Sequence, residues 1–80
     1  MSKIVYSPDE ETFKMALGQR IIDLRHQHGM TQEELADSMR IAARSLSEIE
    51  NGKCCPNLIM LYRIADIFNM KLKDVLDFKY

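Results

Sequence analysis

Residues that begin and end helices follow one another at short intervals in this sequence. Thr31 and Glu34 have the spacing of a capping box, in which each side chain accepts a hydrogen bond from the backbone N–H of the other residue. Gly29 is expected to end the helix before this box, while Asn51-Gly52 marks a further end and Asn57 a further start. These signals restrict the chain to short helices joined by tight connections.

The apolar residues between these signals recur every three or four positions, which is the period of one helix face. The predicted inward positions are Phe13, Leu17, Ile21, Leu24, Leu35, Ala36, Met39, Leu46 and Ile49. Five helices are expected, at about residues 8–28, 32–39, 42–50, 58–68 and 72–76, the first capped by Ser7 with Pro8 at its first position. Only Ile4-Val5-Tyr6 has the character of a strand, and it is too short to form a sheet. The sequence therefore predicts an all-α fold.

Length, charge and the lack of certain residue patterns argue against several kinds of function. A chain of 80 residues is expected to form one domain, and its net charge of −1 argues against holding nucleic acid by bulk positive charge, although a local basic face is compatible. The sequence has no nucleophile–base set and no metal-ligand spacing, so we expect neither an enzyme nor a cofactor. No apolar run approaches the roughly 18 residues of a membrane span, and we expect no signal peptide.

The two cysteines, Cys54 and Cys55, are adjacent in the sequence. Adjacent residues in a trans chain rarely bridge each other, so these cysteines do not predict a disulfide framework. A reducing cytoplasm is the expected location. A zinc site formed with His26 and His28 is an alternative, but the C-x-x-C spacing that is usual in such sites is missing.

Three segments resemble one protein family in both residues and spacing. They are Thr31-Gln32-Glu33-Glu34-Leu35-Ala36, Leu46-Ser47-Glu48-Ile49-Glu50-Asn51-Gly52-Lys53 followed by Pro56, and the tail formed by residues 64–68 and 72–76. They resemble the Cro and phage-repressor type of helix-turn-helix protein, often called the Xre family. The resemblance implies a five-helix, lambda-repressor-like DNA-binding domain with the helix-turn-helix at its second and third helices. Within residues 1–80 we expect a single domain with an N-terminal arm at 1–7, a helical core at 8–77 and a tail at 78–80.

The resemblance also implies which residues face double-stranded DNA, because the third helix of such a motif lies in the major groove. The matching positions are Gln32, Ala42, Ala43, Arg44, Ser45, Glu48, Asn51 and Lys53. Gln32, Asn51 and Lys53 match phosphate-contacting positions, Ser45 the groove wall, and the other four the base-facing positions. Arg44 can bond guanine. The Glu48 carboxylate can accept a hydrogen bond from the amino group of cytosine, or it can form an ion pair with Arg44, four residues earlier.

Further matches bear on the framework of the motif. Arg25 and Glu50 match an ion pair with which the family joins the first helix to the end of the third. Arg40 occupies a turn position where relatives usually have glycine, because the backbone there has positive φ, and a non-glycine residue costs roughly 1 kcal/mol. Ala42 stands where relatives often have a capping Ser or Thr, and alanine cannot cap.

Two classes of function remain open. The first is a sequence-specific DNA-binding transcriptional regulator, expected to be a small homodimeric repressor or controller protein on a palindromic site, with no small-molecule ligand. Its dimer would use the fourth and fifth helices and the C-terminal residues, because residues 58–68 are apolar on more than one side and Phe78 and Tyr80 would otherwise lie on a free tail. The second is a protein-interaction module without intrinsic DNA binding, favoured by the weak basicity and by Ala42 and Ala43.

Overall fold

The computed structural model describes residues 9–79, and all regular secondary structure in that range is helical. The helices are α1 (Asp9–Gln27), α2 (Gln32–Met39), α3 (Ala43–Glu50), α4 (Leu58–Ile67) and α5 (Leu72–Val75). The all-α prediction is therefore confirmed, and each predicted helix end lies within about one residue of the observed end. The predicted cap at Ser7 with Pro8, the N-terminal arm, the segment Ile4-Val5-Tyr6 and Tyr80 lie outside the described residues.

Local capping residues set the starts of α2 and α4. The Thr31 hydroxyl accepts a hydrogen bond from the Glu34 N–H at 3.1 Å, and the Thr31 N–H donates to the Glu34 carboxylate at 2.8 Å, which completes the predicted capping box. The Asn57 side chain accepts from the Met60 N–H at 2.8 Å. By contrast, Ala42 is the N-cap of α3 and provides no side-chain hydrogen bond there. The N–H groups of a helix's first turn have no acceptor within the helix. In α2 and α4 a side chain accepts one of these hydrogen bonds, and in α3 none does.

The turn between α2 and α3 has the left-handed residue that the resemblance implies. Arg40 adopts φ 62° and ψ 42°, and its N–H donates to the Asp37 carbonyl at 3.0 Å. The next N–H, that of Ile41, donates to the Ala36 carbonyl, also at 3.0 Å. These bonds end α2 and turn the chain into α3 without a glycine, so arginine occupies a conformation that glycine adopts at lower cost.

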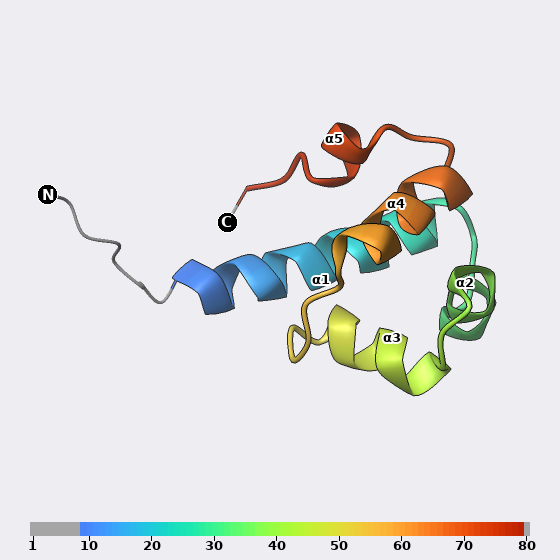
Figure 1. The fold of residues 1–80 in the computed structure, drawn as a ribbon, viewed down its shortest axis with the longest axis horizontal. Coiled ribbons are helices and arrows are strands. Elements are labelled where there is room, and N and C mark those ends of the chain that lie inside the picture. The colour runs from blue at the N-terminus through green and yellow to red at the C-terminus, as the bar shows by residue number, and fades with distance from the viewer. Residues whose placement is uncertain (1–8, 80) are drawn as a thin grey trace, which may run out of the picture.

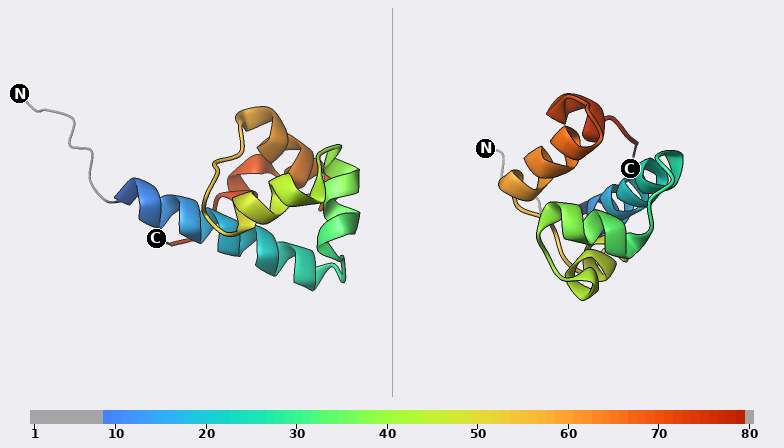
Figure 2. Two further views of the ribbon diagram at one scale, coloured as in Figure 1. Left: turned by 90° about the horizontal axis from the view of Figure 1, so that it is seen from below. Right: turned by 90° about the vertical axis from the view of Figure 1, so that its right-hand side faces the viewer.

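The helices enclose a core that lies beside α1. Figure 1 shows α3 on one side of α1 and α5 on the other, with α2 at the far end, and Figure 2 gives the view onto that end. The fully or nearly fully buried apolar residues are Leu17, Ile21, Leu24, Leu35, Ala36, Met39, Leu46, Ile49, Leu61, Ile64, Ala65, Phe68 and Val75. All the predicted inward positions belong to this set except Phe13, which packs against it and is only partly buried. The hydrophobic period therefore predicted the buried positions of α1 to α3 correctly, whereas it did not separate the buried from the exposed positions of α4 and α5.

Residues 76–79, which follow α5, fold back along α1 (Figure 1). The ring of Phe78 lies 5.6 Å from the ring of Phe13, measured between centroids, and is partly buried. Arg20 on α1 donates to the carbonyls of Asp74 and Val75, at 2.6 and 3.2 Å. Phe78 therefore does not lie on a free tail even within a single chain, because an aromatic ring on α1 covers it, and it gives no separate reason to expect a dimer.

A glycine within α1 allows α3 to approach closely. A Cβ atom at Gly18 would lie 2.5 Å from the Glu50 carbonyl oxygen and 2.6 Å from that of Ile49. Both oxygens belong to the backbone at the end of α3 and cannot rotate away as a flexible side chain could. The absence of a side chain at Gly18 therefore sets the distance between α1 and the last turn of α3.

Candidate nucleic-acid interface

α3 has one face against the core and one toward solvent. Leu46, Ile49 and Glu50 are buried, whereas the Arg44 side chain is 89% exposed and that of Glu48 is 43% exposed. A helix turns once in 3.6 residues, so residues 44 and 48 lie on one face, away from Leu46 and Ile49. The exposed face of α3 is therefore polar, with arginine in its first turn.

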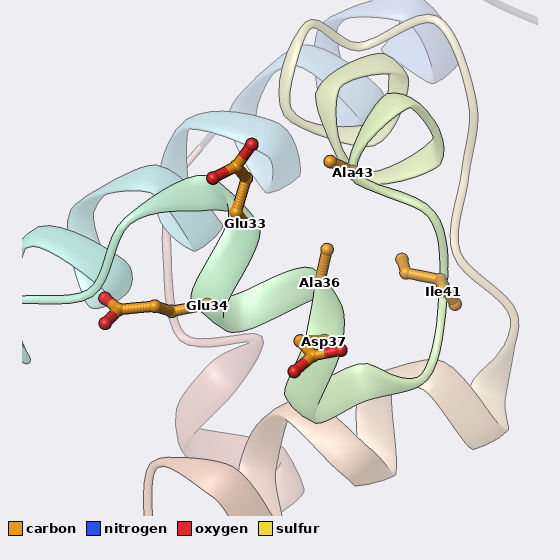
Figure 3. Close-up of a pocket in the computed structure, with 6 residues that line it drawn as sticks. All are labelled: Glu33, Glu34, Ala36, Asp37, Ile41 and Ala43. Atoms are coloured by element: carbon orange, nitrogen blue, oxygen red, sulfur yellow. The ribbon is translucent and has the colours of Figure 1, made fainter.

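The predicted base-facing alanines differ in their surroundings. Ala42 is exposed, but Ala43 is partly buried and packs against the core. Ala43 also lines a shallow groove between α2 and α3, in which Ala36 lies on the opposite side (Figure 3). The methyl group of Ala43 is thus shared between the core and this groove, and only Ala42 is freely exposed. Ser45 is partly buried.

Arg44 and Glu48 lie close together on the exposed face. Arg44 Nε is 3.9 Å from Glu48 Oε2, which is the outer limit of an ion pair. Exposed pairs of this spacing contribute only a few tenths of a kcal/mol, because water screens both charges. The arginine side chain is therefore only weakly held by Glu48 and can turn toward another acceptor at little cost.

A buried ion pair joins the last residue of α3 to α1. Arg25 Nε donates to Glu50 Oε2 at 2.8 Å and Arg25 Nη2 donates to Glu50 Oε1 at 3.1 Å. Only 12% of the Arg25 side chain and 4% of the Glu50 side chain are exposed. The third nitrogen, Arg25 Nη1, donates to the Met30 carbonyl at 3.1 Å. This two-bond geometry fixes the end of α3 against α1 and against the connection that leads to α2.

Gln32, the first residue of α2, belongs to the same network. Its Nε2 donates to Glu50 Oε1 at 2.9 Å, and its side chain is partly buried. The resemblance implied only a phosphate contact for this residue, so sequence reasoning missed the bond to Glu50. No periodic or spacing signal in the sequence joins residues 32 and 50.

The loop after α3 folds back onto the end of that helix. The N–H groups of Lys53 and Cys54 both donate to the Glu48 carbonyl, at 2.9 and 3.3 Å, and Gly52 has φ +77°. Lys53 and Asn51 are exposed, and the Asn51 amide lies 3.4 Å from the Ser47 hydroxyl. Two of the predicted phosphate-contacting residues are therefore held at the C-terminal end of α3 by its own last carbonyls.

The cations of the molecule are divided between internal and exposed positions. Arg20, Arg25 and Arg63 are held by protein acceptors, the last through a 3.1 Å bond to the Met39 carbonyl at the end of α2. The exposed cations of residues 31–57 are Arg40, Arg44 and Lys53. Within residues 31–57, only these three cations are thus exposed to an anionic ligand.

Acidic residues of α2 stand beside the start of α3. Glu33, Glu34 and Asp37 line the groove that Ala43 borders (Figure 3), and all three are exposed. The surface of the two helices is therefore mixed in charge, negative along α2 and positive at Arg44 and the following loop. A polyanion would meet attraction at defined points and not over the whole face.

The residues considered for a zinc site are not brought together. Cys54 and Cys55 are exposed free cysteines, with Cys54 Sγ 3.8 Å from Glu48 Oε1. The His28 ring lies 4.5 Å from that of Phe68. Within residues 9–79, no three His, Cys, Asp or Glu side chains are arranged to hold a metal ion. In the same range, no helix combines the length and the apolar character that crossing a membrane requires.

The sequence and fold are similar to those of known proteins. Residues 21–75 match the helix-turn-helix family HTH_3. An HTH-type transcriptional regulator of Archaeoglobus fulgidus is 39% identical over 59 residues, which are 74% of this chain and 84% of that protein. The clp gene regulator ClgR of Corynebacterium glutamicum superposes with a TM-score of 0.76 at 30% identity, over 80% of this chain and 68% of that one. The biofilm regulator SinR, solved in complex with DNA, gives a TM-score of 0.70 at 29% identity, over 76% and 98% of the two chains.

Proposed function

Since this chain belongs to the helix-turn-helix family HTH_3, we propose that it is a transcriptional regulator that binds double-stranded DNA in a sequence-specific way. The observation that carries the proposal is that α3 exposes Arg44 at its start, held only weakly by Glu48, while the buried Glu50 at its other end is fixed to α1 by Arg25. In a helix-turn-helix protein the second helix of the motif enters the major groove with its first residues toward the base edges. The similar fold of SinR, a protein solved in complex with DNA, supports this reading.

The predicted contact residues divide into two groups in this proposal. Arg44 reads a base pair, because arginine can bond both O6 and N7 of guanine, and Ala42, Ala43 and Glu48 border the same region. Gln32, Asn51 and Lys53 contact phosphates on either side of the groove, and Ser45 lies at its wall. Lys53 carries no sequence information in this arrangement, since the phosphate backbone is the same at every base pair.

Selection of duplexes from a random library is the primary test, because it reports both binding and the arrangement of half-sites. The two cationic residues then separate base reading from phosphate contact. Arg44→Ala should lower the affinity for the selected site by about tenfold or more and that for random duplex much less, since a bidentate contact discriminates by about 1–3 kcal/mol.

Lys53→Ala is the matched control, since it removes an exposed cation outside α3. It should weaken binding to selected and random duplexes by similar factors and reduce the salt dependence by about one counterion for each half-site. If Arg44→Ala lowers the affinity for the selected and the random duplex by the same factor, Arg44 contacts a phosphate and does not read a base. A chain that binds no duplex at low salt would instead be a protein-interaction module.

We further propose that the regulator is a homodimer on a palindromic site, with residues 8–77 as its helical core and the cytoplasm as its location. α4 has three large apolar side chains on its solvent side: Leu58, Ile59 and Tyr62 are 65%, 58% and 61% exposed. Leu76, just after α5, is 37% exposed. A second copy of the chain would cover this surface and place two α3 helices about 34 Å apart, which is one turn of DNA.

Sedimentation of the parent and of one charged variant tests the dimer. The parent should sediment as a dimer at tens of micromolar, the order of concentration at which modest interfaces assemble. Ile59→Lys should shift it to a monomer and weaken binding to the palindromic site, whereas Ser38→Lys, on the exposed side of α2, should leave the mass unchanged. A monomeric parent, or an Ile59→Lys variant that remains dimeric, would contradict this part of the proposal.

A further inference from the structure

The side chain of Arg63, on α4, reaches the last residue of α2. Its Nη1 donates a hydrogen bond to the Met39 carbonyl at 3.1 Å, and Arg63 itself is partly buried. The last four carbonyls of a helix have no partner within the helix, and a cation at this end interacts favourably with the helix dipole. Arg63 therefore caps the C-terminal end of α2 from a different helix.

The capped carbonyl belongs to the peptide bond that precedes the left-handed residue of the turn. That residue, Arg40, has φ 62°, a conformation that is unfavourable for residues other than glycine. Because Arg40 φ is a rotation relative to this peptide plane, a bond that fixes the Met39 carbonyl limits the direction in which the chain leaves α2. The placement of α3 relative to α2 therefore depends on α4 as well as on the turn itself.

Arg63 also lies beside the exposed apolar surface of α4. Ile59 is 58% exposed and precedes Arg63 by four residues, which makes the two side chains neighbours on the helix surface. Tyr62, just before Arg63, is 61% exposed, whereas Ile64, just after it, is fully buried in the core. Arg63 is thus at the border between the surface proposed for the dimer and the interior of the domain.

We propose that Arg63 is a positioning residue that couples the dimer surface of α4 to the turn of the helix-turn-helix, and that this coupling sets the half-site spacing that the dimer accepts. The inference rests on the proposed function, a dimer that binds DNA. A stiff connection between α4 and α2 holds the two motifs of a dimer at one separation. A site with another spacing is then bound only if that connection bends, while Arg63 itself touches no base.

A change of one base pair between the half-sites measures this stiffness. It moves one half-site by about 3.4 Å along the DNA and rotates it by about 35°, since a turn is about 34 Å and about 10.5 base pairs. A stiff dimer should discriminate against the altered site, whereas a dimer with a loosened connection should accept both. The ratio of the affinities for the selected and the altered spacing is therefore the quantity to measure. Loss of one positive charge affects both duplexes alike and cancels in this ratio.

Arg63→Met is the informative substitution, because methionine keeps an apolar stem and has no N–H donor. It should lower the spacing ratio by about three- to tenfold, the range expected for one hydrogen bond. Arg63→Lys keeps both a donor and the charge, so it should recover most of the ratio. Ile21→Val is the control for stability: it shortens a fully buried side chain of α1 and destabilises the fold, and the ratio should stay that of the parent.

Amide hydrogen exchange gives a second measurement, at the turn itself and without DNA. The N–H groups of Arg40 and Ile41 close the turn by donating to carbonyls of α2. Both should exchange about three- to tenfold faster in Arg63→Met, since one hydrogen bond that holds the turn is lost. The Lys53 N–H, which donates to a carbonyl of α3, should exchange as in the parent. Arg63→Gln, which is shorter and uncharged, replaces the methionine variant in every comparison if that variant does not fold.

The possible outcomes separate this inference from the function on which it rests. A lowered spacing ratio that Arg63→Lys restores, together with faster exchange at Arg40, would support the coupling. If the parent binds as a dimer and Arg63→Met keeps the spacing ratio, the inference alone is overturned, and Arg63 only stabilises α2. An equal loss of the ratio in Ile21→Val would also overturn it, because stability alone would then explain the effect. A parent that binds no duplex, or binds as a monomer, would overturn the proposed function and the coupling together.

Discussion

Removal of the Glu50 carboxylate should test how much of the fold depends on the buried ion pair. In Glu50→Ala, the Arg25 guanidinium keeps its charge and its bond to the Met30 carbonyl but loses both bonds to a carboxylate, and only 12% of its side chain is exposed. Gln32 loses its acceptor as well. An unpaired charge at this depth destabilises a protein by about 3–5 kcal/mol.

That loss is large for a domain of this size. Stabilities of about 0.05–0.15 kcal/mol per residue give roughly 4–12 kcal/mol for 80 residues. At about 4–8 °C for each kcal/mol, the melting temperature of Glu50→Ala should fall by at least about 12 °C. Thermal melting and urea unfolding, both followed by far-UV circular dichroism, measure the change, and the urea midpoint should fall with little change in slope.

Two further variants make the result specific. Glu48→Ala removes a carboxylate two residues earlier that is 43% exposed, and it should change stability by no more than about 0.5 kcal/mol. Replacing Arg25 and Glu50 together by Met and Leu should recover much of the loss, because no unpaired charge is then left in the interior. If Glu50→Ala melts as close to the parent as Glu48→Ala does, water or another group compensates Arg25, and the reasoning from burial is refuted.

Three smaller predictions concern the framework of the motif. Gly18→Ala should destabilise the fold by about 1–3 kcal/mol in urea unfolding, because its Cβ would lie 2.5 Å from the Glu50 carbonyl oxygen. A gain in stability would mean that the higher helix propensity of alanine exceeds the steric effect. Arg40→Gly should stabilise the turn by up to about 1 kcal/mol by relieving a left-handed arginine, and a lower melting temperature would contradict this. Thr31→Ala should lower the free energy of unfolding by about 1 kcal/mol, because the capping box is lost. Its melting temperature is compared with that of Gln27→Ala, a control that removes no cap.

Features that depend on neighbours in the sequence were predictable. The Thr31–Glu34 capping box, the Asn57 cap and the buried positions of α1 to α3 all follow from spacings of three or four residues, which a helix turns into contacts. The left-handed Arg40 and the Arg25–Glu50 match came from the family resemblance, because no local pattern indicates either of them.

Features that depend on distant backbone atoms could not be predicted in the same way. Arg20 and Arg63 bond carbonyls at the ends of α5 and α2, and carbonyls are present at every residue, so no residue type marks the acceptor. The bond from Gln32 to Glu50 and the contact of Phe78 with Phe13 also depend on how the helices are placed. Gly18 is a similar case, since the sequence does not indicate that the backbone of α3 packs against this position of α1.

The separation of the two faces of α3 bears on how proteins of this kind can acquire new targets. The inner face, with Leu46, Ile49 and Glu50, is held by the core and by Arg25, whereas the Arg44 side chain is held only by a weak ion pair with Glu48, which also contacts the exposed Cys54 thiol. Changes at the outer positions therefore leave the scaffold intact, and selection can act on them almost independently of folding. A library varied only at residues 44 and 48 should consist mainly of folded proteins. For the DNA-binding regulator proposed above, duplication followed by drift at these two positions would be a short evolutionary route from one operator to another.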